Sequence, residues 1–287
     1  MSERIIMKNP SVSIVIPTYK EVGNIERLIK SIDRVMQSLN DGYEVVLVDD
    51  NSEDGIEALV SMLSNEFPVR IKIRKARRDL SSSVIDGIKM STGDILVVMD
   101  ADLSHPPDKL PKLITLIIEN KCDISIGSRY VKGAGIEGFG AFRKMNAAVS
   151  RVLARPFTNV SDPMSGFFAF RRGIIADYGI LSPIGFKIAL EILVKSGAEK
   201  IAEIPIRFAK RYAGRGKLSI REQFKYLRHL FRLFLFKKKT ISILIDKKRF
   251  IQRCLYIIWA ALVIFFYFKL YLVAKIVGYL EYQKIGA

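Results

Sequence analysis

The chain has 287 residues, enough for one large domain or for one domain with an appendage. Its formal net charge is +17, and residues 207–253 carry most of it, with sixteen lysines and arginines against only Glu222 and Asp246. This basic segment precedes an apolar tail and has no stacking-aromatic motif for nucleic acid, so it favours an anionic lipid surface; a solvated basic face is the alternative. Cys122 and Cys254 are too few for a disulfide framework or a zinc site.

The first half of the chain alternates short β-branched runs with amphipathic segments. Predicted strands cover residues 12–16, 45–48, 69–73, 95–99 and 124–126. Predicted helices cover residues 23–39, 56–67, 82–90 and 108–119. Asn24 is the predicted N-cap of the first helix. This alternation predicts βαβ units and a mostly parallel sheet of the α/β class. No Gly-x-Gly-x-x-Gly follows the first strand, which disfavours a Rossmann dehydrogenase.

Beyond Gly127 the periodicity is weaker. Residues 132–140 contain four glycines and are predicted to form a mobile loop that closes over ligands. The elements expected after this loop are a helix over 142–153, a strand over 164–170, a helix over 186–195 and an extended segment over 201–208.

Two C-terminal segments have the character of membrane-associated chain. Residues 217–236 interleave cations with leucine and phenylalanine, which predicts a basic amphipathic helix in a membrane interface. Residues 256–280 are almost wholly apolar apart from Lys269 and Lys275, but the unbroken run is shorter than the ~20 residues that a span needs. A tilted span, a re-entrant pair, an interfacial helix and a soluble hydrophobic helix all stay open.

These patterns predict three parts. Residues 1–215 form an α/β domain, residues 216–250 an amphipathic interface helix with a linker, and residues 251–287 a hydrophobic, membrane-associated or transmembrane segment. Lysine- and arginine-rich flanks stay on the cytoplasmic side of a membrane, and two such clusters, 237–239 and 247–249, precede the tail. We therefore expect a membrane protein whose α/β domain faces the cytoplasm.

Two carboxylates follow the strand predicted over 95–99. Asp100 and Asp102 lie two residues apart, so on an extended chain their side chains point the same way and can converge on one cation. Hard oxygen donors suit Mg²⁺ or Mn²⁺, with substrate phosphates completing the coordination shell. The alternative is an ordinary polar loop after a strand. His105 lies beside the pair, and a structural role is the preferred prediction for it.

Polar or aromatic residues follow three neighbouring strands. The first strand leads into residues 16–24, the second into 48–55 and the fourth into 100–102. In an open α/β sheet the carboxyl ends of the strands form the ligand-binding edge. A carboxylate at this edge can hold a base edge or ribose hydroxyls, while the metal pair holds a diphosphate.

At this point the chain resembles the family-2 inverting glycosyltransferases with a GT-A fold, and among them the dolichol-phosphate (polyprenyl-phosphate) mannose synthases. The resemblance covers roughly residues 12–230. Beyond the three strand exits, the strings that carry it are Ile126-Gly127-Ser128-Arg129-Tyr130, Asp162-Pro163-Met164-Ser165-Gly166-Phe167-Phe168 and Pro183-Ile184-Gly185-Phe186-Lys187. It implies a GT-A catalytic domain with a Rossmann-like, mostly parallel sheet, followed by an amphipathic interface helix and a C-terminal hydrophobic membrane segment.

The resemblance also implies site residues. The residues implied for the nucleotide are Pro17, Tyr19, Glu21, Val48, Asp50, Arg78, Asp100, Ala101, Asp102, Arg211 and Lys217. Those implied for the metal are Asp100, Asp102 and Ser104, and those for the acceptor phosphate are Arg129, Arg143 and Lys187. Asp102, Arg129 and Arg143 are the implied catalytic residues. Ser165 and Gly166 are expected to form a turn that shapes the acceptor side.

The implied reaction transfers mannose from GDP-mannose to a membrane polyprenyl (dolichyl) phosphate with inversion, aided by Mg²⁺ or Mn²⁺. Its product, dolichyl β-D-mannosyl phosphate, serves glycan and glycoprotein assembly. The partners are thus GDP-mannose, the lipid phosphate and membrane lipid, with no nucleic acid. The first alternative is a glucosyl- or N-acetylglucosaminyltransferase that uses a UDP-sugar. A non-catalytic binding module is another, and a processive polysaccharide synthase is disfavoured because no Gln-x-x-Arg-Trp string is present.

Overall fold

In the computed structural model, the described residues are 11–39, 42–75, 78–182, 184, 187–209 and 220–241, with 255, 256, 259 and 266. Contacts between Cα atoms divide the chain into two units, Met1–Phe234 and Leu235–Ala287. Each unit is described by itself, and the fold below is that of the first.

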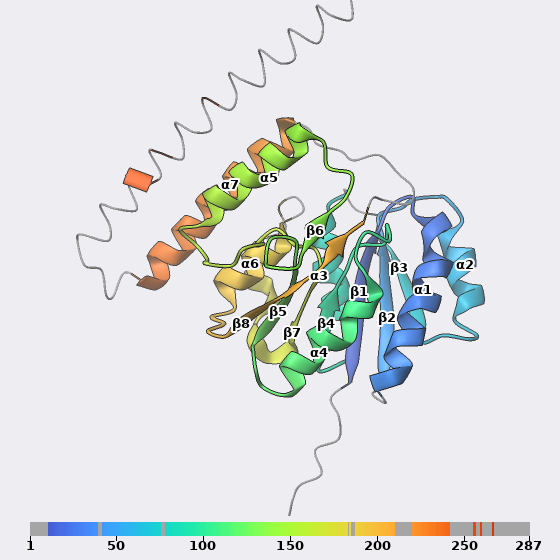
Figure 1. Cartoon of the computed structure of the whole chain (residues 1–287). Helices are drawn as coiled ribbons and strands as arrows, with labels where there is room; N and C mark the ends of the chain where they lie inside the picture. The colour runs from blue at the N-terminus through green and yellow to red at the C-terminus, as the bar shows by residue number, and fades with distance from the viewer. Residues whose placement is uncertain are drawn as a thin grey trace, which may run out of the picture. The chain divides into compact units, whose positions relative to one another are not determined.

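A seven-stranded sheet with the order β3-β2-β1-β4-β7-β5-β8 forms the centre of the first unit (Figure 1). Its strands are β1 (Val12–Thr18), β2 (Tyr43–Asp49), β3 (Val69–Ile73), β4 (Ile95–Val98), β5 (Ile124–Ser128), β7 (Phe168–Arg171) and β8 (Ile201–Pro205). Among these strands, β7 runs antiparallel to both β4 and β5, and the other neighbours pair in parallel. The prediction of a mostly parallel α/β sheet is therefore confirmed.

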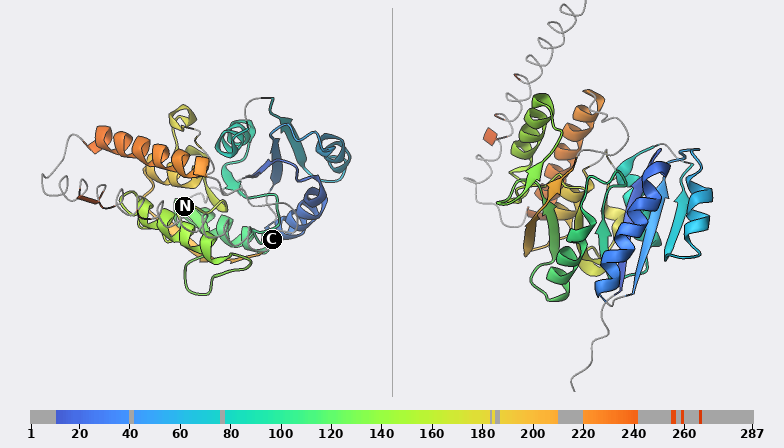
Figure 2. Two further views of the ribbon diagram at one scale, coloured as in Figure 1. Left: turned by 90° about the horizontal axis from the view of Figure 1, so that it is seen from above. Right: turned by 45° about the vertical axis from the view of Figure 1, so that its right-hand side comes forward.

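Helices cover both faces of the sheet (Figure 2). The helices on one face are α1 (Val22–Met36), α2 (Ile56–Leu63) and α4 (Leu110–Ile118). Those on the other face are α3 (Leu80–Met90) and α6 (Ile188–Lys195). Successive side chains of β1 point to opposite faces, so Ile14 and Ile16 pack on the first layer and Val15 on the second. Burial on both faces explains the near-continuous apolar runs of the central strands.

Four short 3-10 helices complete the connections. They are η1 (Gln37–Leu39), η2 (Pro107–Lys109), η3 (Arg172–Ile174) and η4 (Tyr178–Ile180). The predicted N-cap was wrong, because α1 begins at Val22 and Asn24 lies inside its first turn, where its side-chain amide donates to Glu21.

Two long helices lie side by side beyond the end of the sheet (Figures 1 and 2). They are α5 (Ala141–Ala154) and α7 (Ile220–Ile241). Of α7, residues 220–234 belong to the first unit. The hydroxyl of Tyr226 on α7 donates to the backbone carbonyl of Ser150 on α5, at 2.7 Å. The predicted helix over 217–236 is thus present from residue 220 onward in the described part of the chain.

A two-stranded sheet replaces part of the loop predicted over 132–140. β6 (Gly135–Ile136) pairs in parallel with β9 (Arg207–Phe208), far along the chain. This pairing places residues 135 and 136 in a strand, where the sequence predicted a mobile loop. The strand predicted over 164–170 begins only at Phe168, because residues 162–165 form a hydrogen-bonded turn instead.

Most of the predicted hydrophobic tail, 251–287, lies outside the described residues, so its form stays a prediction. A search restricted to the described part of the chain found no helix both long and apolar enough to cross a membrane.

We predict that Gly87→Ala destabilises the fold although alanine favours helix. A Cβ on Gly87 of α3 would lie 2.4 Å from Cγ1 of Val15 and 3.1 Å from Cγ2 of Val48. Overpacking of this kind costs about 1–3 kcal/mol of unfolding free energy, more than the ~1 kcal/mol gained in helix propensity. Chemical denaturation measures the difference. Gly173→Ala is the control, because nothing lies within 4 Å of its added Cβ; equal stability of the two variants would contradict this packing.

Candidate active site

The loops after β1 and β2 are tied together at the carboxyl edge of the sheet. Asp49 is buried and accepts hydrogen bonds from the hydroxyl of Thr18, at 3.0 Å, and from the backbone and hydroxyl of Ser52. The backbone N–H of Lys20 donates to the Ser52 hydroxyl at 2.7 Å. Lys20 and Asn51 both adopt the left-handed region, with φ of 59° and 54°. Non-glycine residues in this region cluster at functional sites, where surrounding contacts hold them.

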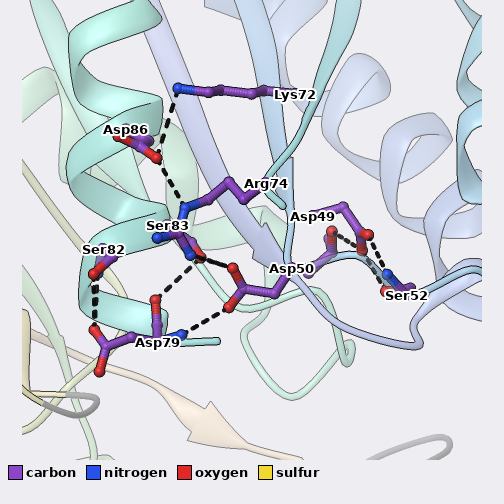
Figure 3. A network of polar contacts seen from close by, with 10 residues as sticks. Asp49, Asp50, Ser52, Lys72, Arg74, Asp79, Ser82, Ser83 and Asp86 are labelled. Atoms are coloured by element: carbon purple, nitrogen blue, oxygen red, sulfur yellow. Dashed lines mark hydrogen bonds and ion pairs between the residues drawn. The ribbon is translucent and has the colours of Figure 1, made fainter. Parts of the chain in front are cut away.

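Asp50 anchors the start of α3 to the end of β2 (Figure 3). Its buried carboxylate pairs with the guanidinium of Arg74 and accepts from the Ser83 hydroxyl at 3.0 Å and the Asp79 backbone at 3.1 Å. Arg74 also donates to Asp86 at 2.8 Å. Asp50 therefore positions this corner of the site. The contribution of Arg74 was not predicted, because its segment carries no recognisable motif.

The residues predicted for the nucleotide base come together around Tyr19. The guanidinium carbon of Arg78 lies 3.6 Å from the centroid of the Tyr19 ring. Pro17 and Val48 are buried register partners on β1 and β2, directly behind this loop. Glu21 follows at the start of α1 and accepts the Asn24 amide at 2.6 Å.

The loop after β4 presents oxygen atoms. Asp102 is buried, and its Oδ1 accepts from the backbone of Ser104 at 3.1 Å and from the Ser104 hydroxyl at 2.5 Å. Ala101 is buried between the two aspartates, and the side chain of Asp100 remains 31% exposed. Leu103 takes a φ of 60°, which turns the chain sharply between Asp102 and Ser104.

His105 closes this loop from below. Its Nδ1 accepts the backbone N–H of Asp100 at 3.0 Å, which leaves Nε2 to carry the ring proton, 3.7 Å from Oδ2 of Asp100. The ring stacks on Phe167 at 5.2 Å and meets Phe208 edge-on at 5.4 Å. Burial lowers the pKa of His105, against the opposing effect of the Asp100 and Asp102 charges. The lowered pKa favours the neutral imidazole, which accepts a hydrogen bond from the Asp100 backbone and lies beside the Asp100 carboxylate.

Gly166 leaves room for the Asp100 carboxylate. A Cβ at this position would lie 3.0 Å and 3.3 Å from its two oxygens and 3.2 Å from Cε1 of His105. The oxygen donors of Asp100, Asp102 and Ser104 fit a hard divalent cation whose shell substrate oxygens complete. Among the described residues no group of three or more His, Cys, Asp or Glu side chains that could hold a metal ion is found.

A buried ion pair holds Arg129 just after β5. Asp162, fully buried, accepts from Nε and Nη2 of Arg129 at 2.7 Å and 2.8 Å, and from its backbone N–H at 3.0 Å. The Glu203 carboxylate accepts the backbone N–H groups of Ser161 and Asp162 and so orients that carboxylate. Burial alone would lower the pKa of Arg129, but the hydrogen bonds and charge of Asp162 outweigh it and raise the pKa.

Aromatic contacts link Arg129 to the loop that follows β4. The guanidinium carbon of Arg129 lies 5.3 Å from the ring centroid of Phe208, which also meets His105. The negative charge of Asp100 is among the causes that raise the pKa of Arg129, after the contributions of Asp162 and Tyr130.

Three arginines gather around Tyr130. The guanidinium carbons of Arg151 and Arg129 lie 3.8 Å and 5.6 Å from its ring centroid. Burial raises the pKa of Tyr130, while the charges of Arg129, Arg151 and Arg143 oppose the rise. Arg129 and Arg143 thus both act electrostatically on Tyr130, and their shared role stays a prediction. Arg151 was not predicted, because one arginine in a basic helix carries no distinguishing signal.

The remaining predicted cations lie further along the chain. Arg143 stands in the first turn of α5, with its guanidinium carbon 3.8 Å from the Phe139 ring centroid. Lys187 directly precedes α6 and lies 4.0 Å from the Tyr226 ring centroid. Arg211 and Lys217 lie outside the described residues, so their placement stays a prediction.

We predict that His105 makes the stability pH-dependent. Because its pKa is lower in the folded chain than its ordinary 6.5, the unfolded chain takes up the proton first on acidification. The free energy of unfolding should therefore fall as the pH drops below about 6.5, by up to about 1.4 kcal/mol per pH unit. His105→Asn keeps an acceptor for the Asp100 N–H but cannot titrate, so its slope should be flatter.

Denaturation titrations in EDTA from pH 7.5 to 5.5 measure both slopes. His229, the other of the two histidines, is present in both chains and cancels in the comparison. Identical slopes for the parent and His105→Asn would show that the ring does not resist protonation.

The chain is similar to known proteins in sequence and in fold. The family model of glycosyl transferase family 2 matches residues 13–179. A dolichol-phosphate mannosyltransferase of Pyrococcus furiosus is 45% identical over 226 residues, which are 77% of this chain but only 63% of that protein. An enzyme of the same name from Mycosarcoma maydis is 38% identical, over 82% of this chain and 82% of its own length. That from Saccharomyces cerevisiae is 36% identical, over 78% of this chain and 87% of its own length.

Solved structures share the fold at low identity. Mannosyl-3-phosphoglycerate synthase from Rubrobacter xylanophilus superposes with a TM-score of 0.57 at 14% identity, covering 83% of this chain and 76% of that one. Glucosyl-3-phosphoglycerate synthase from Mycobacterium tuberculosis, in complex with Mn²⁺ and UDP-glucose, gives a TM-score of 0.54 at 19% identity, covering 79% and 78%. At these identities the likeness concerns the fold alone.

Proposed function

This chain belongs to glycosyl transferase family 2, and from that premise we propose that it transfers mannose from GDP-mannose to a polyprenyl (dolichyl) phosphate. The observation that carries the proposal is the joining of two opposite kinds of site at one sheet edge. Asp100, Asp102 and Ser104 supply oxygen donors, and Arg129, locked by Asp162, supplies a cation beside them. The name shared by the three curated relatives supports the choice of mannose and of dolichyl phosphate.

The acceptor requires binding more than activation. A phosphate monoester has its second pKa near ~6, so its oxygen is already a nucleophile at neutral pH and no strong general base is needed. Arg129 and Arg143 would hold this phosphate, because arginine binds phosphate oxygens in a bidentate geometry. Asp162 keeps the Arg129 side chain in one orientation before the acceptor arrives.

The reaction exchanges one bond at the anomeric carbon of mannose. The lipid phosphate oxygen forms the new bond to this carbon, and the bond to the diphosphate breaks with its electron pair leaving on GDP. Attack opposite the leaving group converts an α-linked donor into a β-linked lipid phosphate sugar. A divalent cation, Mg²⁺ or Mn²⁺, held by Asp100, Asp102 and Ser104 would neutralise charge on the diphosphate. Arg211 and Lys217 are proposed to assist in binding the diphosphate.

The base of the nucleotide is proposed to bind beside Tyr19. Pro17 and Val48 form a buried floor, and Arg78 already stacks on the Tyr19 ring, so an aromatic base has a flat cationic and aromatic surface to meet. Glu21 and Asp50 are proposed to hold hydroxyl or ring N–H groups, Asp50 from its fixed position against Arg74.

Membrane lipid is the proposed third partner. Within the first unit, α7 exposes 58% of Phe224 and 62% of Phe231, with Arg228 and Arg232 also exposed. Phenylalanine turned outward among cations is typical of a helix in a lipid interface. We further propose that residues 216–250 form the interface segment, that 251–287 associate with or span the membrane, and that the catalytic domain, 1–215, faces the cytoplasm.

We predict that Asp102→Asn abolishes most of the transferase activity. The substitution removes one carboxylate from the proposed cation site, for which a loss of at least about 10²-fold in turnover is expected. The assay supplies dolichyl phosphate with radiolabelled GDP-mannose and Mg²⁺ or Mn²⁺, and repeats the reaction with UDP-glucose and UDP-N-acetylglucosamine.

Asp108→Asn is the matched control, because Asp108 is exposed and pairs with the neighbouring Lys109. It should retain parental turnover. Full activity of Asp102→Asn would remove the metal role, and faster transfer from a UDP-sugar would establish the alternative donor class.

We also predict that the outer face of α7 enters lipid. In a variant lacking both native cysteines, a bimane label on Phe231→Cys should be quenched strongly by brominated lipid in anionic liposomes and weakly by aqueous iodide, because position 231 is 62% exposed on a basic helix. The control label on Met62→Cys of α2, 70% exposed, should show the reverse pattern. Iodide quenching at 231 equal to that at 62 would refute the lipid contact.

A further inference from the structure

The inward face of α7 carries two polar side chains in a buried position. Tyr226, His229 and Leu233 are almost fully buried, whereas Phe224 and Phe231 are exposed. Residues three and four apart share one face of a helix, so the buried three form a single stripe. Two of the three are therefore polar groups placed where an anchoring helix would be expected to bury hydrocarbon.

Tyr226 contacts two elements at once. Its hydroxyl donates to the carbonyl of Ser150 on α5 at 2.7 Å, and the ammonium of Lys187 lies 4.0 Å from its ring centroid. Lys187 is itself 9% exposed, and an ammonium removed from water is attracted strongly to an aromatic face. One side chain thus joins α5 to the residue that begins α6.

His229 adds a second polar contact one turn further along α7. Its Nε2 lies 3.2 Å from Oε2 of Glu191 on α6. Glu191 also accepts from Lys195 at 2.6 Å and from the backbone of Ser182 at 2.6 Å. Burial would raise the pKa of Glu191, but these hydrogen bonds outweigh it and lower the pKa, so the carboxylate is held charged.

Contacts of this kind specify geometry as well as attachment. Apolar packing tolerates small rotations of a helix. The same rotation separates buried polar groups from their partners, and a buried polar group without a partner is strongly unfavourable. The axial rotation of α7 is therefore restricted by Tyr226 and His229. The position of α7 in turn affects two groups. The Tyr226 ring contacts Lys187, and the Tyr226 hydroxyl contacts α5, the helix whose first turn carries Arg143.

We propose that Tyr226 is a positioning residue for the acceptor phosphate, because its ring holds the Lys187 ammonium while its hydroxyl holds α5. The docking of the basic helix then sets the two cations of the acceptor side, and a displaced helix would leave them misplaced. This inference rests on the proposed function, which assigns Lys187 and Arg143 to the acceptor phosphate.

The test measures binding of the two substrates separately. The full chain in detergent micelles is titrated calorimetrically with farnesyl phosphate, a short polyprenyl phosphate, and in parallel with GDP-mannose. Tyr226→Phe keeps the ring and removes the hydroxyl, and Tyr226→Leu removes both. Tyr178→Leu is the matched control, because the Tyr178 hydroxyl also donates to a backbone carbonyl at 2.7 Å, that of Arg172.

We expect Tyr226→Leu to weaken farnesyl phosphate binding about tenfold, the loss of one desolvated cation–π contact, while GDP-mannose binding stays within about twofold. Tyr226→Phe keeps the ring over Lys187 and loses only the hydrogen bond to α5, so it should weaken farnesyl phosphate binding by less than Tyr226→Leu. Tyr178→Leu should change neither affinity. In a Lys187→Met background, Tyr226→Leu should weaken binding no more than Tyr226→Phe does, since the cation that the ring positions is gone.

Parental binding by Tyr226→Leu, or an undiminished effect of Tyr226→Leu in the Lys187→Met background, overturns the inference. Parental binding by Lys187→Met alone also overturns it, and that measurement needs no folded Tyr226→Leu. If the variants show the expected changes in binding but the parent transfers no mannose, the proposed reaction is wrong and the positioning role stands. If the parent binds no farnesyl phosphate, both fail.

Discussion

The ion pair between Arg129 and Asp162 is the interaction on which the proposed acceptor side of this site depends. A buried carboxylate and guanidinium are each strongly unfavourable when alone, and together they are tolerated only with good geometry and full hydrogen bonding. Here the geometry is bidentate, and Glu203 holds the backbone on the far side of Asp162. The pair therefore fixes a cation at the end of β5.

The donor side follows the same arrangement with the charges exchanged. Asp50 is neutralised by Arg74 and by hydrogen-bond donors at the start of α3, and His105 braces Asp100 without adding a full charge. The network of Figure 3 makes α3 part of the site through Ser82, Ser83 and Asp86, with Asp79 as the residue that precedes the helix. In both halves, side chains proposed to meet substrate are held by partners that lie deeper in the protein.

Much of the fold could be predicted, because its signals are local. Apolar runs marked β1, β2 and β4, and the polar residues after each run identified the binding edge, since parallel strands end together. The long-range pairings could not be predicted. Gly135 and Ile136 join a strand more than seventy residues later, so a glycine-rich stretch that predicts a loop became β6. Likewise nothing near Asp162 in the sequence indicates Arg129 as its partner, although both lie in strings that carry the family resemblance.

The reversed direction of β7 explains how distant segments meet. Its first residue, Phe168, pairs with Val98 at the end of β4 and with Ile126 on β5, so the chain arrives at the binding edge here instead of departing from it. The segment just before β7 is thereby brought against the exits of its two neighbours, and it delivers Asp162 and Gly166. At the opposite rim the same strand leaves through Gly173, which is open to solvent. Insertions and deletions should therefore be tolerated far less well just before β7 than just after it. For the parallel strands of the sheet the order is the reverse.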